Sequence, residues 1–308
     1  VLIIGYGYWG PKLTRNFSNS NYFNLHSICD LNNSKLKEAK KNYPNVKIYT
    51  NYQDAIRNNK FQLVVISTPT TTHYKIAKKI IQNKMNVLVE KPLCLNLKEH
   101  LNLNRLAKYN KVKIFIDYPF IHSGGINYVK ELIKNNKYGK INSIESYREQ
   151  APIRKDTDVF WDLSIHDISI FSYLLSKKRI LSIKPIIYNK KQKNFKKISI
   201  FLQYNNTNVF IKNNWDSPTK IRLIKFVFDK AIVYLDENET LYKIKIYKKL
   251  NNQFNNYSLE VPNIDLTEPL MNLINHIYYS ITKNKNNLLN EKFYTNVTKT
   301  MTMIQNRL

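Results

Sequence analysis

The segment from Trp161 to Asp167 has the sequence WDLSIHD, which contains side chains suited to acid–base chemistry. Asp162 and His166 are four residues apart at the predicted start of a helix, so both can face the same way. A carboxylate beside an imidazole orients its tautomer and stabilises the imidazolium, as a general base requires. The same spacing fits a helix N-cap at Asp162 and a partly buried His166, and spacing alone does not separate these two interpretations. The six histidines show no ligand clustering, so we expect no metal site.

A glycine-rich segment, GYGYWG, directly follows an apolar run at the start of the chain and precedes a helical pattern. It matches G-x-G-x-x-G, in which the three glycines permit a tight turn, close approach of a pyrophosphate and close packing of helix on strand. Amides at the helix N-terminus then bind the anion. A glycine-rich turn without a ligand is the alternative, but the strand–turn–helix context favours dinucleotide binding. We therefore expect cofactor contacts from Gly5, Gly7, Tyr8, Trp9 and Gly10.

Asp30 lies 20 residues beyond the last glycine of this motif, at the end of the second predicted strand. A carboxylate at this place accepts hydrogen bonds from the adenosine ribose hydroxyls and repels a 2′-phosphate. We therefore expect NAD to be preferred over NADP. Asn32 and Lys35 are close enough in sequence to moderate that preference.

Two further loops follow predicted strands and should line the cofactor, because ligands of open parallel sheets bind outside the carboxyl ends of the strands. The first has the sequence STPTTTH, for which an N-cap and a surface histidine are the simpler interpretation when it is taken alone. The second has the sequence EKP, and its lysine, at a strand end and before a proline, should point into the cleft. The residues expected to contact the cofactor here are Ser67, Thr68, Pro69, His73, Glu90 and Lys91.

The elements that must hold these residues can be predicted from apolar periodicity. Nearly continuous apolar runs predict buried parallel strands over residues 1–4, 25–30, 61–67, 86–90 and 113–117. Helical spacing between them predicts helices over residues 11–18, 34–42, 73–83 and 97–109. Alternation of strand and helix at this rhythm predicts an α/β fold with a doubly wound parallel sheet.

The pattern changes after residue 118, so we predict one domain over residues 1–118 and a second over residues 119–308. Helices are predicted over residues 125–135 and 163–175, with a strand over residues 141–148 between them. Repeated strand-like runs fill residues 180–261, and turns at Asn205-Asn206 and Asp236-Glu237-Asn238 predict a mostly antiparallel sheet. Two helices, over residues 268–283 and 291–307, complete an α+β domain.

Composition excludes several classes of protein. The chain has 308 residues and a formal net charge of +27, but only eight of its 49 basic residues are arginines and the lysines are spread throughout. A nucleic-acid protein more often concentrates arginine on one face. Abundant Lys, Asn, Ile and Tyr indicate an AT-rich coding bias, so we expect no specific nucleic-acid partner. Charge-driven nucleic-acid binding, with its steep salt dependence, remains a hypothesis to test. No apolar run is long enough to cross a membrane, so we expect no membrane partner.

Two cysteines, Cys29 and Cys94, are too few for a disulfide framework and favour a reducing, cytoplasmic location. The chain starts with Val1 in an apolar run, without Met or a signal peptide. We therefore expect a few leading residues to be missing or trimmed.

Taken together, these motifs resemble the Gfo/Idh/MocA family of nicotinamide-dependent sugar oxidoreductases. The matching pieces are GYGYWGPKLTRNF, STPTTTH, EKP and VFWDLSIHDISIFSYLL, and a linker-like DYPFIHSGGINYVKELI followed by YGKI. TEPL resembles the start of the family's C-terminal helical segment, so the resemblance extends over nearly the whole chain. Within the family, GYGYWGP with WDLxxHD is most similar to the branch that oxidises nucleotide-linked amino-sugar uronates at C3. Asp117 departs from that branch, which often has His there, and this could alter substrate fit without touching the hydride step.

The resemblance implies a Rossmann domain followed by a domain whose open sheet forms a homodimer or homotetramer. It places the lysine of E-K-P at Lys91 and the pair of D-x-x-x-H at Asp162 and His166. We expect His166 to take the hydroxyl proton, Asp162 to orient it and Lys91 to hold the oxygen, with Lys91 as base in an alternative version. Lys91, His166 and Arg148 are the expected substrate contacts, although a sheet-surface ion pair explains Arg148 equally well. A non-catalytic NAD sensor of the same fold is the alternative function.

Overall fold

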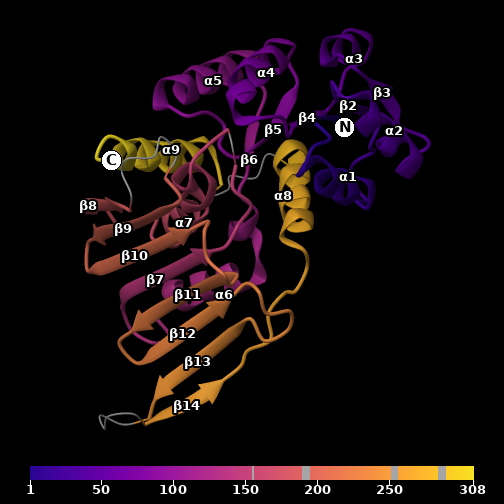
Figure 1. Cartoon of the computed structure of the whole chain (residues 1–308). Coiled ribbons are helices and arrows are strands. Elements are labelled where there is room, and N and C mark those ends of the chain that lie inside the picture. The colour runs from indigo at the N-terminus through magenta and orange to yellow at the C-terminus, as the bar shows by residue number, and fades with distance from the viewer. Residues whose placement is uncertain (155, 189–194, 251–255, 284–288) are drawn as a thin grey trace. The chain divides into compact units, whose positions relative to one another are not determined.

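The computed structural model describes residues 1–154, 156–188, 195–250, 256–283 and 289–308 (Figure 1). The chain divides into two compact units. The first contains Val1–Pro119 and Glu268–Lys299, and the second contains Phe120–Thr267 and Thr300–Leu308. The predicted division into residues 1–118 and 119–308 stays a prediction, because a late segment of the chain is counted here with the first unit.

The first unit is built on a parallel sheet of six strands in the order β3-β2-β1-β4-β5-β6. This order is that of the dinucleotide-binding doubly wound fold, so the predicted parallel sheet is confirmed. Strands β1 and β4 have every residue buried, as their apolar runs predicted. The strands are β1 (Leu2–Ile4), β2 (Ser27–Cys29), β3 (Lys47–Tyr49), β4 (Leu63–Ile66), β5 (Asn86–Glu90) and β6 (Ile114–Asp117).

Helices connect these strands and cover the sheet. The connecting helices are α1 (Gly10–Ser18), α2 (Asn33–Asn42), α3 (Tyr52–Asn58), α4 (Thr70–Gln82) and α5 (Leu97–Asn110). Two late helices, α8 (Pro269–Lys283) and α9 (Glu291–Gln305), contribute to this unit, α9 through its residues up to Lys299. Leu273, Ile274 and Ile277 of α8 pack into the core formed with Leu13 and Phe17 of α1. The sequence did not predict β3 or α3, because each is short and β3 has no buried residue.

The second unit is built on an eight-stranded sheet in the order β14-β13-β12-β11-β7-β10-β9-β8. Every neighbouring pair is antiparallel except β7 and β10, which confirms a mostly antiparallel sheet. The parts of the predicted strand-rich region at residues 189–194 and 251–255 lie outside the described residues. The strands are β7 (Ile141–Glu149), β8 (Ile180–Ile187), β9 (Lys197–Tyr204), β10 (Thr207–Asn214), β11 (Ile221–Phe228), β12 (Ala231–Asp236), β13 (Ile244–Lys249) and β14 (Tyr257–Glu260).

Two helices, α6 (Gly124–Lys134) and α7 (Ile165–Leu174), pack on the same face of this sheet (Figure 1). Gly125 of α6 lies against the Leu235 side chain of β12, and Asp167 of α7 accepts a hydrogen bond from Ser146 of β7. The backbone register pairs Leu235 and Ser146 with the same residue of β11, Ile224, so both helices cover one side. The predicted helix over residues 163–175 begins earlier, with a π-helical turn over Phe160–Ser164. Such turns are rare and are frequently found at functional sites.

Candidate functional site

The carboxyl edge of the parallel sheet gathers residues from five strands. Gly5 follows β1, Asp30 follows β2, Ser67 follows β4, Lys91 follows β5 and Asp117 ends β6. All strands of this sheet run in one direction, so these residues lie at the same edge. This edge is where dinucleotides bind in doubly wound folds.

The glycine-rich turn has the geometry that its spacing predicted. Gly5 has a φ of +99°, and a Cβ there would lie 2.6 Å from the Ser67 carbonyl oxygen. A Cβ on Gly10 would lie 2.2 Å from the Gly5 carbonyl oxygen, so helix α1 can start only with glycine. A Cβ on Gly7 would meet no atom within 4 Å. Open space beside Gly7, next to the N-terminus of α1, fits the phosphates of a dinucleotide.

Asp30 is held by the backbone on both sides. The Tyr6 amide donates to Oδ2 at 2.6 Å, and the Asn32 amide donates to Oδ1 at 2.8 Å. The carboxylate therefore links the end of β2 to the glycine-rich turn. It is half-buried, and an ionised carboxylate accepts more than two hydrogen bonds, so capacity remains for ribose hydroxyls. That contact stays a prediction.

Tyr8 and Trp9, between the second and third glycines, lie in different environments. The Tyr8 side chain is 76% exposed, whereas the Trp9 indole donates to Oδ2 of the buried Asp117 at 2.5 Å. The Lys12 ammonium of α1 lies 4.3 Å from the centre of each ring. The glycine-rich turn after β1 is therefore joined through Trp9 to the end of β6.

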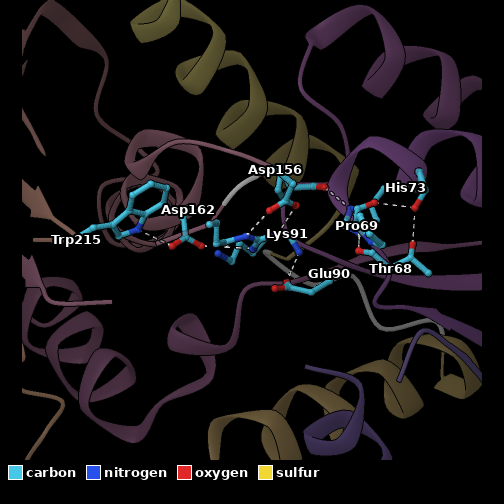
Figure 2. Close-up of polar contacts among 11 residues, drawn as sticks. Thr68, Pro69, His73, Glu90, Lys91, Asp156, Asp162 and Trp215 are labelled. Atoms are coloured by element: carbon cyan, nitrogen blue, oxygen red, sulfur yellow. Dashed lines mark hydrogen bonds and ion pairs between the residues drawn. The ribbon is translucent and has the colours of Figure 1, made fainter. Parts of the chain in front are cut away.

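The loop after β4 is organised by Ser67 and His73. The Ser67 hydroxyl donates to the Gly5 carbonyl oxygen at 2.8 Å, which joins the loop to the glycine-rich turn. His73 is buried, with Nε2 2.7 Å from the Thr68 carbonyl oxygen and Nδ1 2.8 Å from the Pro92 carbonyl oxygen (Figure 2). His73 thus joins the loops that follow β4 and β5. Cofactor contacts from this loop, Pro69 included, stay a prediction.

Lys91 lies directly beyond β5 and is buried. Its amide donates to the Glu90 carboxylate, which fixes the side chain of the preceding residue (Figure 2). The backbone register pairs Glu90 with Asp117. Lys91 is therefore held among the strand ends, and its contact with cofactor or substrate stays a prediction.

In the second unit, the π-helical turn before α7 places Asp162 against two partners. The Trp215 indole donates to Oδ2 of Asp162 at 2.9 Å, and Nη1 of Arg154 lies 3.5 Å from Oδ1 (Figure 2). Asp158 caps this turn, since its carboxylate accepts from the Trp161 amide at 2.9 Å. Burial raises the pKa of Asp158. Asp162 lies within the turn Phe160–Ser164, whose N-cap position is Val159, so Asp162 is not the N-cap.

His166, one turn further on, packs edge-on against Phe120, with ring centres 5.0 Å apart at an angle of 86°. The same Phe120 ring lies 4.2 Å from the Arg148 guanidinium carbon. His166 and Arg148 therefore share an aromatic neighbour within one unit. Orientation of His166 by Asp162 stays a prediction.

Arg148 forms an ion pair, as its alternative interpretation expected, but the pair is buried and not on the sheet surface. Its Nε donates to Oδ1 of Asp167 at 2.7 Å, and both side chains are at most 2% exposed. Asp167 also accepts from Ser146 and from Asn213. Among the described residues, Nη1 and Nη2 of Arg148 are buried and have no hydrogen-bond partner. Buried donors without partners are rare in folded proteins, which is consistent with a substrate group as their partner. That contact stays a prediction.

Asp117, Trp215 and Asp158 were not among the predicted site residues. Asp158 precedes by three residues the Trp161 amide that donates to its carboxylate, and an Asp at that spacing is a recognisable signal for the start of a helical turn. No local pattern predicts the hydrogen bonds of Asp117 and Trp215, because their partners are 108 and 53 residues away in sequence. Within the described part of the chain, no cluster of His, Cys, Asp and Glu could hold a metal ion.

Sheet order, glycine geometry and the Asp30 carboxylate define the first unit as a dinucleotide-binding Rossmann domain. Residues 1–118 match the model of a family described as an oxidoreductase family with an NAD-binding Rossmann fold. Residues 1–118 therefore match the Gfo/Idh/MocA oxidoreductase family, as the resemblance predicted.

Three relatives illustrate the similarity. The chain is 25% identical over 182 residues to myo-inositol 2-dehydrogenase of Thermotoga maritima, covering 57% of this chain and 54% of that enzyme. UDP-N-acetylglucosamine 3-dehydrogenase of Acidithiobacillus ferrooxidans has a TM-score of 0.85 at 18% identity, covering 100% of this chain and 96% of that one. An Agrobacterium radiobacter oxidoreductase, in complex with NAD+, L-tartaric acid and magnesium, has a TM-score of 0.84 at 13% identity, covering 99% and 95%.

The chain spans about half or less of the length of the curated relatives it matches. The structural likenesses, at these identities, show that the chain shares the fold of these two solved structures. No helix of the described residues is long and apolar enough to cross a membrane.

Proposed function

We propose that this protein is an NAD-dependent oxidoreductase that transfers a hydride between nicotinamide and a carbinol carbon of a sugar derivative. The observation that carries the proposal is the edge of the parallel sheet. There the open space at Gly7, the Asp30 carboxylate and the buried Lys91 follow three strands of one sheet. Gly7 would leave space for the pyrophosphate, Asp30 would accept hydrogen bonds from the ribose, and Lys91 would provide a cation for the reacting end of the cofactor.

NAD would be held by the amides at the start of α1, by the space at Gly7 and by Asp30. When bound, its nicotinamide supplies or accepts the hydride. The chain's own part is to position the ring, exclude water and handle the proton of the substrate hydroxyl. Asp30 would disfavour the 2′-phosphate of NADP, because the phosphate and the half-buried carboxylate would repel each other.

The proposed roles of the polar side chains follow from their chemistry. Lys91 would hold the substrate oxygen and stabilise negative charge that develops there, since a buried ammonium interacts more strongly than an exposed one. His166 would take the hydroxyl proton, and Asp162 would stabilise the imidazolium. Lys91 as proton acceptor is the second version, and the variants below separate the two.

The finer proposal is that the substrate is a nucleotide-linked amino-sugar uronate oxidised at C3. It is supported by the motif GYGYWGP with WDLxxHD and by the fold shared with a UDP-N-acetylglucosamine 3-dehydrogenase. The two unsatisfied guanidinium nitrogens of Arg148 would suit an anionic or hydroxyl-rich group. Burial raises the pKa of Glu237, whose carboxyl lies in the field of Arg148 and accepts from the Ser123 hydroxyl at 3.4 Å.

The decisive experiment measures NADH formation with UDP-linked sugars and their uronates for wild type, Lys91→Ala and His166→Ala. Lys75→Ala, on the exposed face of α4, is the matched control for removal of a lysine charge. We expect losses of about 100-fold or more in kcat for the two site variants, on the order expected for loss of a general base or a charge stabiliser. If Lys91→Ala abolishes the acidic limb of the pH profile and His166→Ala keeps it, Lys91 is the base. Full activity in both variants refutes the mechanism, and bound NAD that no sugar reduces favours the sensor.

We further propose a homo-oligomer formed through the face of the eight-stranded sheet opposite α6 and α7, and a cytoplasmic location. That face has an aromatic cluster in which Phe210 contacts Tyr147 and Phe201, and Phe201 is 44% exposed. Exposed aromatic groups of this kind favour an interface. Light scattering of wild type and Phe201→Ser tests it, since a smaller assembly is expected for the variant.

A further inference from the structure

Asp117 ends β6 at the edge of the parallel sheet that holds the cofactor motif, and it is fully buried. Its Oδ2 accepts a hydrogen bond from the Trp9 indole at 2.5 Å. Within the described residues, its Oδ1 is buried and has no hydrogen-bond partner. One carboxylate oxygen is therefore engaged by the glycine-rich turn, and the other faces the interior unsatisfied. A buried carboxylate with one hydrogen bond is costly, so its retention calls for a role.

The surroundings of Asp117 contain few compensating groups. Lys91 provides a favourable positive field, and the Trp9 indole provides the hydrogen bond. The Tyr294 hydroxyl of α9 lies in the electrostatic field of Asp117, and Glu90 is its backbone neighbour on β5. Burial outweighs the two favourable groups and raises the pKa of Asp117 from 3.8 to about 6. The carboxyl therefore changes charge within the range where many enzymes work.

We propose that Asp117 is a positioning residue of the cofactor site, whose ionised carboxylate fixes Trp9 and the glycine-rich turn and supplies the buried counter-charge for Lys91. This inference rests on the proposed NAD site. It adds to that site a residue, Asp117, that makes no direct contact with the phosphates or the ribose of NAD.

The physical argument compares the two protonation states. An ionised carboxylate makes a stronger hydrogen bond to an indole N–H than a neutral carboxyl does. Trp9 is the N-cap residue of α1, so a fixed indole also fixes the first turn of that helix, whose amides face the proposed phosphates. Protonation weakens this link and removes one negative charge from the surroundings of Lys91. NAD binding should therefore weaken as the pH falls through about 6.

The contribution of Asp117 to folding stability should increase as the pH falls, whereas NAD binding should weaken. A residue that served only to stabilise the fold would not show this opposition. Because the folded-state pKa is above its value of 3.8 in the unfolded chain, the folded state binds more protons between these two pH values. The contribution of Asp117 to stability therefore falls as the pH rises from about 4 to about 6. Asp117→Asn keeps the shape and an acceptor for Trp9 but removes the charge. The variant should melt higher than wild type at about pH 7.5, and this difference should disappear at about pH 5.

The first test follows the indole N–H signals by two-dimensional NMR between about pH 5 and pH 8, with Trp9→Phe to assign the Trp9 signal. We expect the Trp9 signal to titrate with a midpoint of about 6 in wild type and in Asp54→Asn, a matched loss of charge at an exposed site on α3. It should not titrate in Asp117→Asn. A Trp9 signal that is constant in wild type, or that titrates equally in Asp117→Asn, overturns the proposal without any reference to NAD.

The second test measures the NAD dissociation constant by calorimetry at the same two pH values as the melting experiment. We expect wild type and Asp54→Asn to bind several-fold more weakly at the lower pH, with about tenfold as the upper limit for one proton. Asp117→Asn should bind equally at both pH values. If wild type binds no NAD at either pH, the proposed function fails and the NMR result decides the inference alone. If NAD binds and Asp117→Asn keeps the full pH dependence, the inference fails and the proposed function stands.

Discussion

Asp30→Ala is the substitution that most directly tests cofactor choice. The Asp30 carboxylate accepts from the Tyr6 amide at 2.6 Å and from the Asn32 amide at 2.8 Å, and it is proposed to accept from the ribose hydroxyls. Alanine removes all of these hydrogen bonds, whereas Gly7 and the start of α1 remain to hold the pyrophosphate. The substitution should therefore weaken NAD binding without abolishing it.

The magnitude follows from the hydrogen bonds that alanine cannot accept. A hydrogen bond to a charged group contributes about 1.5–3 kcal/mol, and each 1.4 kcal/mol or so is a factor of ten in affinity. The NAD dissociation constant should rise by about 10- to 150-fold. Water can replace the acceptor at the exposed Asn32 amide, whereas Tyr6 is buried, so the free protein should lose about 1–3 kcal/mol of stability.

Calorimetric titration of NAD and NADP into wild type, Asp30→Ala and Asp30→Asn measures these changes. Wild type should prefer NAD by at least about tenfold, since the 2′-phosphate meets both a missing hydrogen bond and like charge. Asp30→Asn keeps an acceptor but removes the repulsion, so its preference should fall more than its NAD affinity. Equal or tighter binding of NADP by wild type would mean that a basic neighbour such as Lys35 overrides Asp30, and the reasoning would be refuted.

Four other substitutions test the packing and charge of the site. Gly7→Ala should fold with an unchanged Tm and bind NAD at least about tenfold more weakly. Gly10→Ala should lower the Tm markedly in thermal melts, because its Cβ would lie 2.2 Å from the Gly5 carbonyl oxygen. Trp215→Phe removes a hydrogen bond of 2.9 Å to Asp162, so it should lower kcat several-fold and shift the pH–rate profile with little change in NAD affinity. Arg148→Met leaves a buried carboxylate unpaired and should cost about 3–5 kcal/mol by urea unfolding, and a cost below about 1 kcal/mol would contradict the buried ion pair.

The sequence predicted the parts of the fold that depend on local patterns. Strands β1, β4 and β5 are recognisable because both faces are buried, so nearly every residue must be apolar. The glycine-rich turn is recognisable because its backbone tolerates no side chain at Gly5 or Gly10, whatever surrounds it. Strand β3 was missed since it is an exposed sheet edge of three residues, where no such restriction applies.

Only the tertiary structure decided which side chains meet. Spacing grouped Asp162 with His166, and that pairing stays a prediction. No spacing indicated that Asp162 also accepts a hydrogen bond from Trp215, which directly follows β10. Trp9 was recognised within its motif, yet its partner Asp117 is 108 residues away and depends on the order of β1, β4, β5 and β6. Apolar periodicity specifies which face of an element is buried. The distance between two polar groups on different elements depends on sheet order, register and the path of the chain between them, none of which a local pattern contains.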